Sequence, residues 1–121
     1  MPRIDLPSGP EAPSLGLRAL EGWLDGVDEA VADRVRLAAG ELLGNAVAHG
    51  PGRSIGLEWT CGRGGGVLRI VDGGEVTPDA IAAAQLPEAS ATGGRGLFIL
   101  HTVADDIAVD RDGALRLDFR T

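Results

Sequence analysis

Cysteine is almost missing from this sequence, because Cys61 is the only one among 121 residues. A single cysteine cannot form an internal disulfide, and such scarcity is typical of proteins kept in a reducing compartment. The first residues, Met1 to Asp5, include a proline and an acid where a secretory signal would have an apolar run. No stretch approaches the roughly 18 consecutive apolar residues that a membrane span requires. We therefore expect a cytoplasmic protein that does not contact a membrane.

Positive charge is also in short supply. Lys and Arg together number 11 against 18 Asp and Glu, so the formal net charge is -7. A protein whose main partner is nucleic acid needs an excess of Lys and Arg on at least one face, and the sequence contains no basic stripe. We expect no direct binding of nucleic acid.

Aromatic residues are few, with no Tyr and two Phe, whereas glycine is abundant at 19 residues. The hydrophobic share of 44% and the charged share of 24% are typical of a globular domain rather than a disordered chain. A chain of this length folds as one domain that buries roughly two-thirds of its unfolded surface without a metal or a disulfide. So many glycines indicate tight turns or close backbone approaches, and their positions are the main clue to function.

The spacing of apolar residues changes between period 2 and period 3.6 along the chain, which predicts alternating strands and helices. The expected strands are 3–6, 54–61, 67–71, 107–109 and 114–119, and the expected helices are 14–26, 29–49, a short one starting at 77, and 97–104. These elements predict an α+β fold over residues 1–121. We expect a two-layer α/β sandwich, with a mostly antiparallel sheet and the helices packed on one face.

Local signals mark the boundaries of these elements. Pro10 and Pro13 indicate a loop before the first helix, and Asp28 is suited to cap the second. The run 62–66 is almost entirely glycine. Because it joins two strand-like segments, a hairpin turn is favoured over a phosphate cradle. Residues 88–94 are expected to form a loop.

Three groups of residues could carry chemistry, and the first lies on the long helix. Glu41, Asn45 and His49 follow one another at intervals of four, so they share one stripe of that helix. An Asn carbonyl is a suitable Mg²⁺ ligand, and a Glu one turn away could deprotonate a hydroxyl. The ordinary alternative is a solvated polar face. Gly40 and Gly44 lie beside the stripe, cost helix stability, and leave space for something to lie against the backbone.

The second group, Asp72-Gly73-Gly74, directly follows an apolar strand. A carboxylate there could accept a hydrogen bond from an exocyclic amine such as that of adenine, although an ordinary Asp-Gly turn has the same sequence. The third group, Thr92 to Leu97, precedes a predicted helix and holds Arg95 between Gly94 and Gly96. Backbone N–H groups at a helix N-terminus bind anions, but a loop with an incidental arginine is the alternative.

The order of these groups is more specific than any one of them. A helix with Glu-x-x-x-Asn-Ala-x-x-His-Gly comes first, then a strand followed by Asp-x-Gly, then Gly-x-Gly-Leu opening a helix. This order resembles the ATPase superfamily of gyrase, the heat-shock chaperone ATPase and the histidine kinases. Within it, the chain is most similar to the small anti-sigma-factor serine kinases of bacterial partner-switching systems. The resemblance covers residues 3–120.

The resemblance implies a role for each matching residue in binding ATP and Mg²⁺. Asn45 would coordinate the Mg²⁺ that bridges the phosphates, and Glu41 would be the general base toward a serine or threonine hydroxyl. Arg95 would steady the γ-phosphate. The phosphate-facing turn would comprise Gly94, Gly96 and Leu97. His49 also matches, with a structural hydrogen bond at the helix end as its favoured role.

On the adenine side, Asp72 would bind the amino group and Gly74 would flank the base. Two departures from the family pattern fall here. Val76 stands where the family has a second glycine, and Ala114 stands where a threonine often helps to hold the aspartate. These changes raise the alternative of a domain that binds nucleotide weakly or not at all.

The leading hypothesis is therefore an ATP-dependent serine/threonine kinase that phosphorylates a small antagonist protein and also sequesters a sigma factor. The second is a module that binds ATP or only partners, without phosphoryl transfer. A histidine-kinase catalytic domain is disfavoured because Gly74 and Gly94 are only 20 positions apart, too few for a long nucleotide lid. The resemblance also implies a homodimer formed through strand 3–6 and the apolar side of the helix Leu15–Val27, unless the monomer covers those residues.

Overall fold

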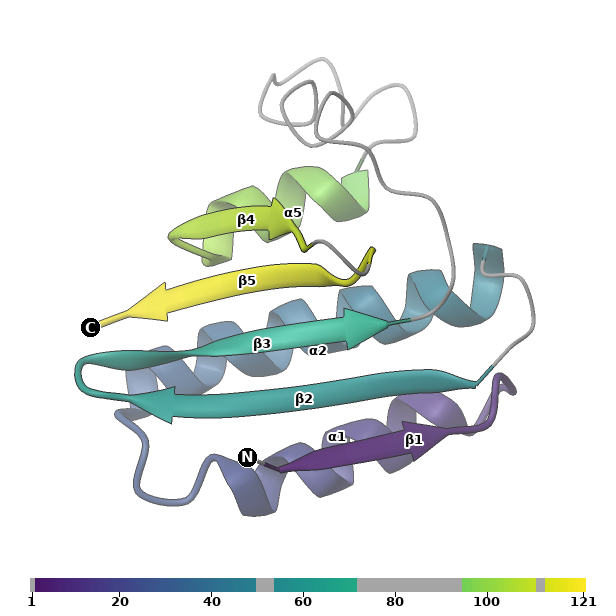
Figure 1. Cartoon of the computed structure of the whole chain (residues 1–121), viewed down its shortest axis with the longest axis horizontal. Helices are drawn as coiled ribbons and strands as arrows, with labels where there is room; N and C mark the ends of the chain where they lie inside the picture. Colours follow the sequence, from purple (N-terminus) through teal and green to yellow (C-terminus); the bar gives the residue numbers. More distant parts are fainter. Residues whose placement is uncertain (1, 50–53, 72–94, 111–112) are drawn as a thin grey trace.

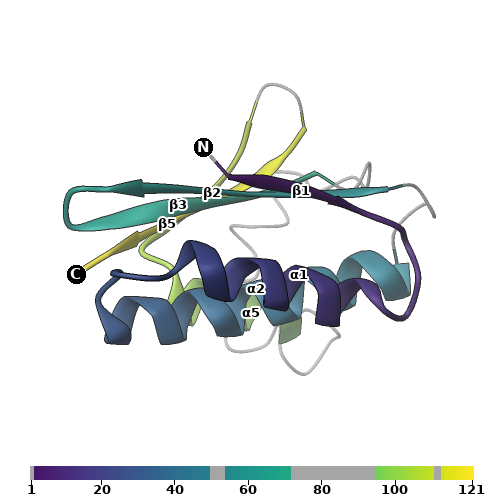
Figure 2. The same ribbon diagram turned by 90° about the horizontal axis from the view of Figure 1, so that it is seen from below.

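The fold is a layer of helices packed on one face of an antiparallel sheet (Figures 1 and 2). The computed structural model describes residues 2–49, 54–71, 95–110 and 113–121, and the side chains within them except those of 49 and 95–98. The sheet has the strand order β1-β2-β3-β5-β4, and every pairing is antiparallel. The strands are β1 Arg3–Leu6, β2 Ile55–Gly62, β3 Gly65–Val71, β4 Asp106–Val109 and β5 Leu115–Arg120.

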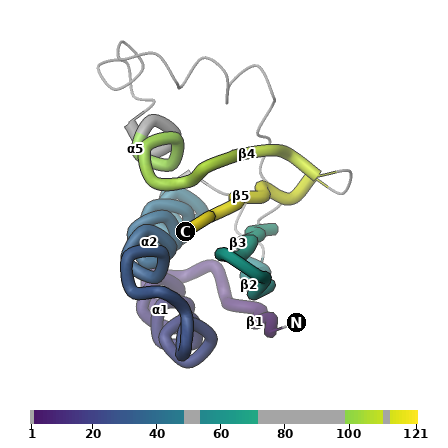
Figure 3. The backbone as a smooth tube through the Cα atoms, turned by 90° about the vertical axis from the view of Figure 1, so that its left-hand side faces the viewer, coloured from purple at the N-terminus to yellow at the C-terminus, as the bar shows by residue number. Residues whose placement is uncertain are grey.

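Three helices form the second layer: α1 Ala12–Trp23, α2 Glu29–His49 and α5 Arg95–Val103. Figure 3 shows all three on the same side of the strands, with α2 between α1 and α5. The predicted α+β sandwich is confirmed, and β1 lies at one edge of the described sheet. The predicted helix starting at 77 and the loop 88–94 lie outside the described residues. None of the described helices has both the length and the apolar character that crossing a bilayer demands.

The prediction for the first helix was wrong at its start. The helix α1 begins at Ala12, and Pro13 lies in its first turn rather than in the preceding loop. A proline is tolerated there because the N–H groups of the first turn have no partner within the helix. The predicted cap of α2 is confirmed, since Asp28 Oδ1 accepts hydrogen bonds from the backbone N–H groups of Ala30 and Val31 at 3.0 and 3.2 Å.

The glycine run after β2 forms the predicted hairpin turn. Gly62 pairs with Gly65, and Gly64 between them has a φ of 77°, which an L side chain rarely adopts. The carbonyl of Gly64 accepts a hydrogen bond from the backbone N–H of Thr121 at 2.8 Å. The turn therefore joins β2 and β3 and also holds the end of β5.

A glycine in β3 makes room for the largest side chain of the core. Trp59 is 1% exposed, and its ring lies against Gly66 and 6.4 Å from the ring of Phe119. A Cβ on Gly66 would stand 2.5 Å from Cζ2 of Trp59 and 2.7 Å from the carbonyl oxygen of Thr60. The indole and the backbone leave no space for that atom.

We expect Gly66→Ala to lower the free energy of unfolding by about 1–3 kcal/mol, because a methyl group overpacks this part of the core. Gly62→Ala is the matched control in the same hairpin. No described atom lies within 4 Å of the added Cβ at Gly62. Urea unfolding of both variants measures the difference, and equal midpoints would show that the indole moves aside at no cost.

The outer face of the sheet carries a chain of charges that the sequence analysis did not identify. Glu58 is 6% exposed and accepts a hydrogen bond from Arg3 at 2.7 Å and another from Arg69. Arg69 also donates to Asp110 at 2.5 Å. The carboxylate of Glu58 is buried, whereas Arg69 is half-buried and Arg3 is exposed. This network links β1, β2 and β3 to the residue that follows β4.

Candidate functional site

The predicted Glu and Asn lie on one flank of α2. Glu41 is half-buried and Asn45 is exposed. Arg34 precedes them on the same stripe and identifies the neighbour of this flank, because its Nη1 donates to the main-chain carbonyl of Val103, the last residue of α5, at 3.0 Å. Glu41 and Asn45 are therefore on the side of α2 that faces α5.

The two helices run in opposite directions (Figure 1). Arg34 meets the C-terminal end of α5, so residues further along α2 approach the N-terminal end of α5. The nine residues of α5 span about 12 Å, whereas Glu41 and Asn45 lie about 10 and 16 Å beyond Arg34 along α2. The first turn of α5 is thus at the level of Glu41 and Asn45.

That first turn contains three residues singled out in the sequence, Arg95, Gly96 and Leu97. The predicted start of this helix at 97 was late by two residues. The first N–H groups of a helix have no acceptor within it, and together with the helix dipole they attract anions. The fold brings the N-terminal end of α5 to the level of a carboxylate and an amide oxygen on α2.

The space beside α2 is open on the described part of the molecule. Apart from the neighbouring residues and the backbone of α2 itself, no described heavy atom lies within 4 Å of the point where a Cβ would stand on Gly40 or Gly44. Within the same part of the chain, no hydrogen bond or ion pair engages the side chains of Glu41 and Asn45. An oxygen ligand, an unpaired carboxylate and an open stretch of helix fit a bound Mg²⁺–nucleotide.

The described residues include no group of three His, Cys, Asp or Glu side chains that could hold a metal ion by themselves. Asn45 would thus be a protein ligand to an ion held mainly by phosphate oxygens, which is the usual way in which Mg²⁺ is bound with nucleotides. The remaining predicted site residues, Asp72, Gly74 and Gly94, lie outside the described residues, as does the side chain of His49.

The strand that leads to Asp72 ends at the same side of the molecule. Figure 1 shows the tip of β3, the last turns of α2 and the start of α5 toward one end of the fold. The family model for the histidine kinase-like ATPase domain matches residues 6–119, nearly the whole chain. The chain belongs to the histidine kinase-like ATPase family. No curated protein matches the chain at a significant level.

The predicted superfamily is thereby confirmed, and a histidine kinase-like ATPase domain is a nucleotide-binding module. The arrangement of α2, β3 and α5 agrees with this assignment, because it brings the end of β3, the last turns of α2 and the first turn of α5 to one end of the fold (Figure 1). Asp72 directly follows Val71, the last residue of β3, in the sequence.

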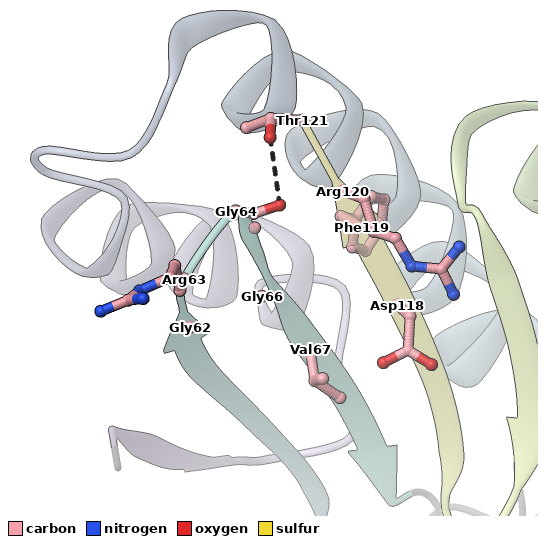
Figure 4. A pocket seen from close by; sticks show the side chains of 10 residues that line it. Gly62, Arg63, Gly64, Gly66, Val67, Asp118, Phe119, Arg120 and Thr121 are labelled. Atoms are coloured by element: carbon pink, nitrogen blue, oxygen red, sulfur yellow. Dashed lines mark hydrogen bonds between the residues drawn. The ribbon is translucent and has the colours of Figure 1, made fainter.

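A hollow of about 470 Å³ lies at the other end of β3 (Figure 4). It is lined by the glycine turn 62–66, by Val67 and by residues 118–121. The strand β3 is seven residues long, with Gly65 at this end and Val71 at the other. This hollow of the ATPase domain is therefore far from Glu41 and Asn45, and none of the predicted site residues lines it.

Sequence reasoning missed Arg34, which connects α2 to α5 and to the end of β5. Its partners are 69 to 86 residues away in the chain. Its spacing of seven from Glu41 was the one available signal, because it places both residues on the same stripe of α2. That stripe was interpreted as starting at Glu41.

Proposed function

We propose that this ATPase-family domain binds Mg²⁺–ATP between α2 and the first turn of α5 and transfers the γ-phosphoryl group to a serine or threonine of a partner protein. The observation that carries the proposal is the position of Glu41 and Asn45 on the α5-facing flank of α2, without partners among the described residues. A phosphate between these elements is within reach of both helices.

Each residue then has a distinct task. Asn45 holds Mg²⁺, which neutralises charge on the phosphates when it is bound. Glu41 takes the proton of the substrate hydroxyl while the oxygen of that hydroxyl attacks the γ-phosphorus. The bond between the γ-phosphorus and the β–γ bridging oxygen breaks, so that ADP leaves. Arg95 and the backbone of Gly94, Gly96 and Leu97 receive the phosphates. Asp72 and Gly74 bind the adenine.

We further propose that the substrate is a small antagonist protein and that the same domain sequesters a sigma factor, as the resemblance implies. Partner binding is proposed to require a homodimer formed along β1. Leu20 of α1 and Leu24, which directly follows α1, are buried within the chain, whereas Leu15 remains 38% exposed. The contact would therefore rest on the free edge of β1 and on Leu15 rather than on the whole apolar side of α1.

One observation favours a second candidate, a module that binds partners without phosphoryl transfer. Ala114 is fully buried and has only a methyl group where the family often has a threonine hydroxyl. It has no hydroxyl with which to hold Asp72, so adenine would be bound with fewer hydrogen bonds.

The proposal is tested with the wild-type protein, Mg²⁺–ATP and a heat-treated extract of the source cells, whose own kinases are inactivated. Calorimetric titration should show saturable binding of Mg²⁺–ATP. Label from the γ-phosphate should then appear on an extract protein as acid-stable phosphoserine or phosphothreonine. Binding without transfer would favour the second candidate, and acid-labile phosphohistidine would instead indicate a histidine-kinase domain.

Gly44→Ala should separate stability from binding. Alanine in this helix should raise the free energy of unfolding by about 0.5–1 kcal/mol. Its methyl group should also enter the proposed site and weaken Mg²⁺–ATP binding by roughly tenfold, about 1.4 kcal/mol. Gly22→Ala in α1 is the control, because no described atom lies near its added Cβ and it is remote from the site. Equal affinities in the two variants would show that nothing binds beside Gly44.

A further inference from the structure

Arg34 connects three elements through one guanidinium group. Its Nη1 donates to the carbonyl of Val103 at 3.0 Å and to Asp105 at 3.3 Å, and its Nη2 donates to the carbonyl of Arg120. The carbon of the guanidinium lies 6.0 Å from the centre of the Phe119 ring. This group of contacts, here called the Arg34 junction, joins α2 to the end of α5 and to β5.

The Arg34 junction caps the C-terminal end of α5. The last carbonyl groups of a helix have no donors within it and carry the negative end of its dipole. Arg34 supplies both a donor and a positive charge to Val103. Asp105, two residues later, also accepts the backbone N–H of Arg120 at 2.5 Å, and this bond with that of Arg34 holds the pKa of Asp105 below its usual range.

The chain after α5 is held as well. The backbone N–H of Asp105 donates to the carbonyl of Asp118 at 2.8 Å, so the short connection between α5 and β4 is hydrogen-bonded to β5. Phe119, the ring beneath the guanidinium, is 1% exposed and lies in the core against Trp59. The C-terminal end of α5 is therefore fixed to a rigid part of the fold.

This attachment sets the position of the other end of α5. A short helix moves as a rigid rod, so a slide or rotation at Val103 is transmitted to Arg95. Arg34 belongs to the same helix, and the same flank of it, as Glu41 and Asn45. The Arg34 junction thus fixes the position of α5 along α2 relative to Glu41 and Asn45.

We infer that Arg34 is a positioning residue for the phosphate end of the site, because it fixes the first turn of α5 against Glu41 and Asn45. The inference rests on the proposed binding of Mg²⁺–ATP between these helices. Misplacement of phosphate-binding groups by a fraction of an ångström weakens recognition of the phosphates. Groups that bind only the base are attached to β3 and are not displaced.

The test compares Arg34→Ala and Arg34→Lys with Arg36→Ala. Arg36 is a matched control on the same helix, since it also makes several ion pairs, with Glu21, Glu29 and Asp33, but on the outer and α1-facing sides of α2. Affinity for Mg²⁺–ATP is measured by calorimetry and affinity for adenosine by NMR titration. Circular dichroism shows which variants are folded.

Arg34→Ala is expected to weaken Mg²⁺–ATP binding by about tenfold and adenosine binding by less than about twofold. Lysine keeps the charge and the stem over Phe119 but lacks the planar fork that reaches several acceptors, so Arg34→Lys should show a smaller loss of the same kind. Arg36→Ala should match the wild type with both ligands. If Arg34→Ala does not fold, the comparison of Mg²⁺–ATP and adenosine affinities in Arg34→Lys tests the inference.

Several results would overturn the inference. They are wild-type affinity in both folded Arg34 variants, an equal loss for adenosine and Mg²⁺–ATP, and an equal loss in Arg36→Ala. Wild-type affinity in both Arg34 variants would show that α5 keeps its position without the Arg34 junction. Either of the equal losses would show that the substitution destabilises the whole fold rather than the phosphate end of the site. Failure of the wild-type protein to bind Mg²⁺–ATP would overturn the proposed function itself, and the wild-type titration alone shows this.

Discussion

Replacing Asn45 with alanine is expected to weaken binding of Mg²⁺–ATP by about a hundredfold, because it removes the protein's oxygen ligand to the ion. Binding of ATP in the presence of EDTA should change by no more than about twofold, since contacts to the base and to the first turn of α5 are kept. The loss should therefore be confined to the magnesium-dependent part of the affinity. Calorimetric titrations with and without Mg²⁺ measure both quantities.

Two further variants make this result specific. Asn45→Asp keeps an oxygen ligand and should retain more magnesium-dependent affinity than Asn45→Ala. Leu37→Ala shortens another exposed residue of α2, which is 50% exposed, and should bind like the wild type. An equal fall with and without Mg²⁺ in Asn45→Ala would contradict a ligand role and indicate a contact with the nucleotide.

Most of the fold could be predicted because its signals are local. The change from period 2 to period 3.6 distinguishes strands from helices, and Asp28 identifies the start of α2 from its own neighbourhood. Pro13 was misassigned because the same residue is acceptable in a loop and in the first turn of a helix. In the folded chain Ala12 is fully buried. The backbone N–H of Leu15 donates to the carbonyl of Glu11, which places Pro13 inside the helix.

The contacts that hold the site in place could not be predicted in this way. Arg34 donates to acceptors on β5 and at the end of α5, and Glu58 accepts from Arg3, which lies 55 residues earlier in the chain. Such pairs depend on the order of strands in the sheet and on the direction of α5, which no local pattern specifies. Arginine and glutamate in amphipathic segments normally indicate a solvated face, so their partial burial is a property of the tertiary structure.

The candidate site shows the same division. Glu41 and Asn45 could be placed on one stripe because helical spacing is regular. That this stripe faces α5, and that the first turn of α5 lies level with it, follows only from the contact between Arg34 and Val103. The sequence could suggest which residues take part, and the three-dimensional structure adds which of them can reach one ligand.

Glu41→Gln is expected to lower the rate of phosphoryl transfer by about 10²–10⁴-fold, because the amide has the shape of the carboxylate but cannot accept the proton of the hydroxyl. Affinity for Mg²⁺–ATP should stay within about twofold of the wild type, since Asn45 and the first turn of α5 are unchanged. The measurement is the initial rate of acid-stable phosphoprotein formation in the heat-treated extract at saturating ATP.

Glu29→Gln is the matched control for this change. Glu29 lies on the same helix, is exposed, and loses the same single negative charge, but it is at the opposite end of α2 and pairs with Arg36. Its rate should equal that of the wild type. Transfer that persists in Glu41→Gln would mean that another group, or water, takes the proton. Equal losses in both variants would mean that the charge of α2 affects docking of the partner protein, because a general base must contact the reacting hydroxyl and Glu29 is too far along the helix to do so.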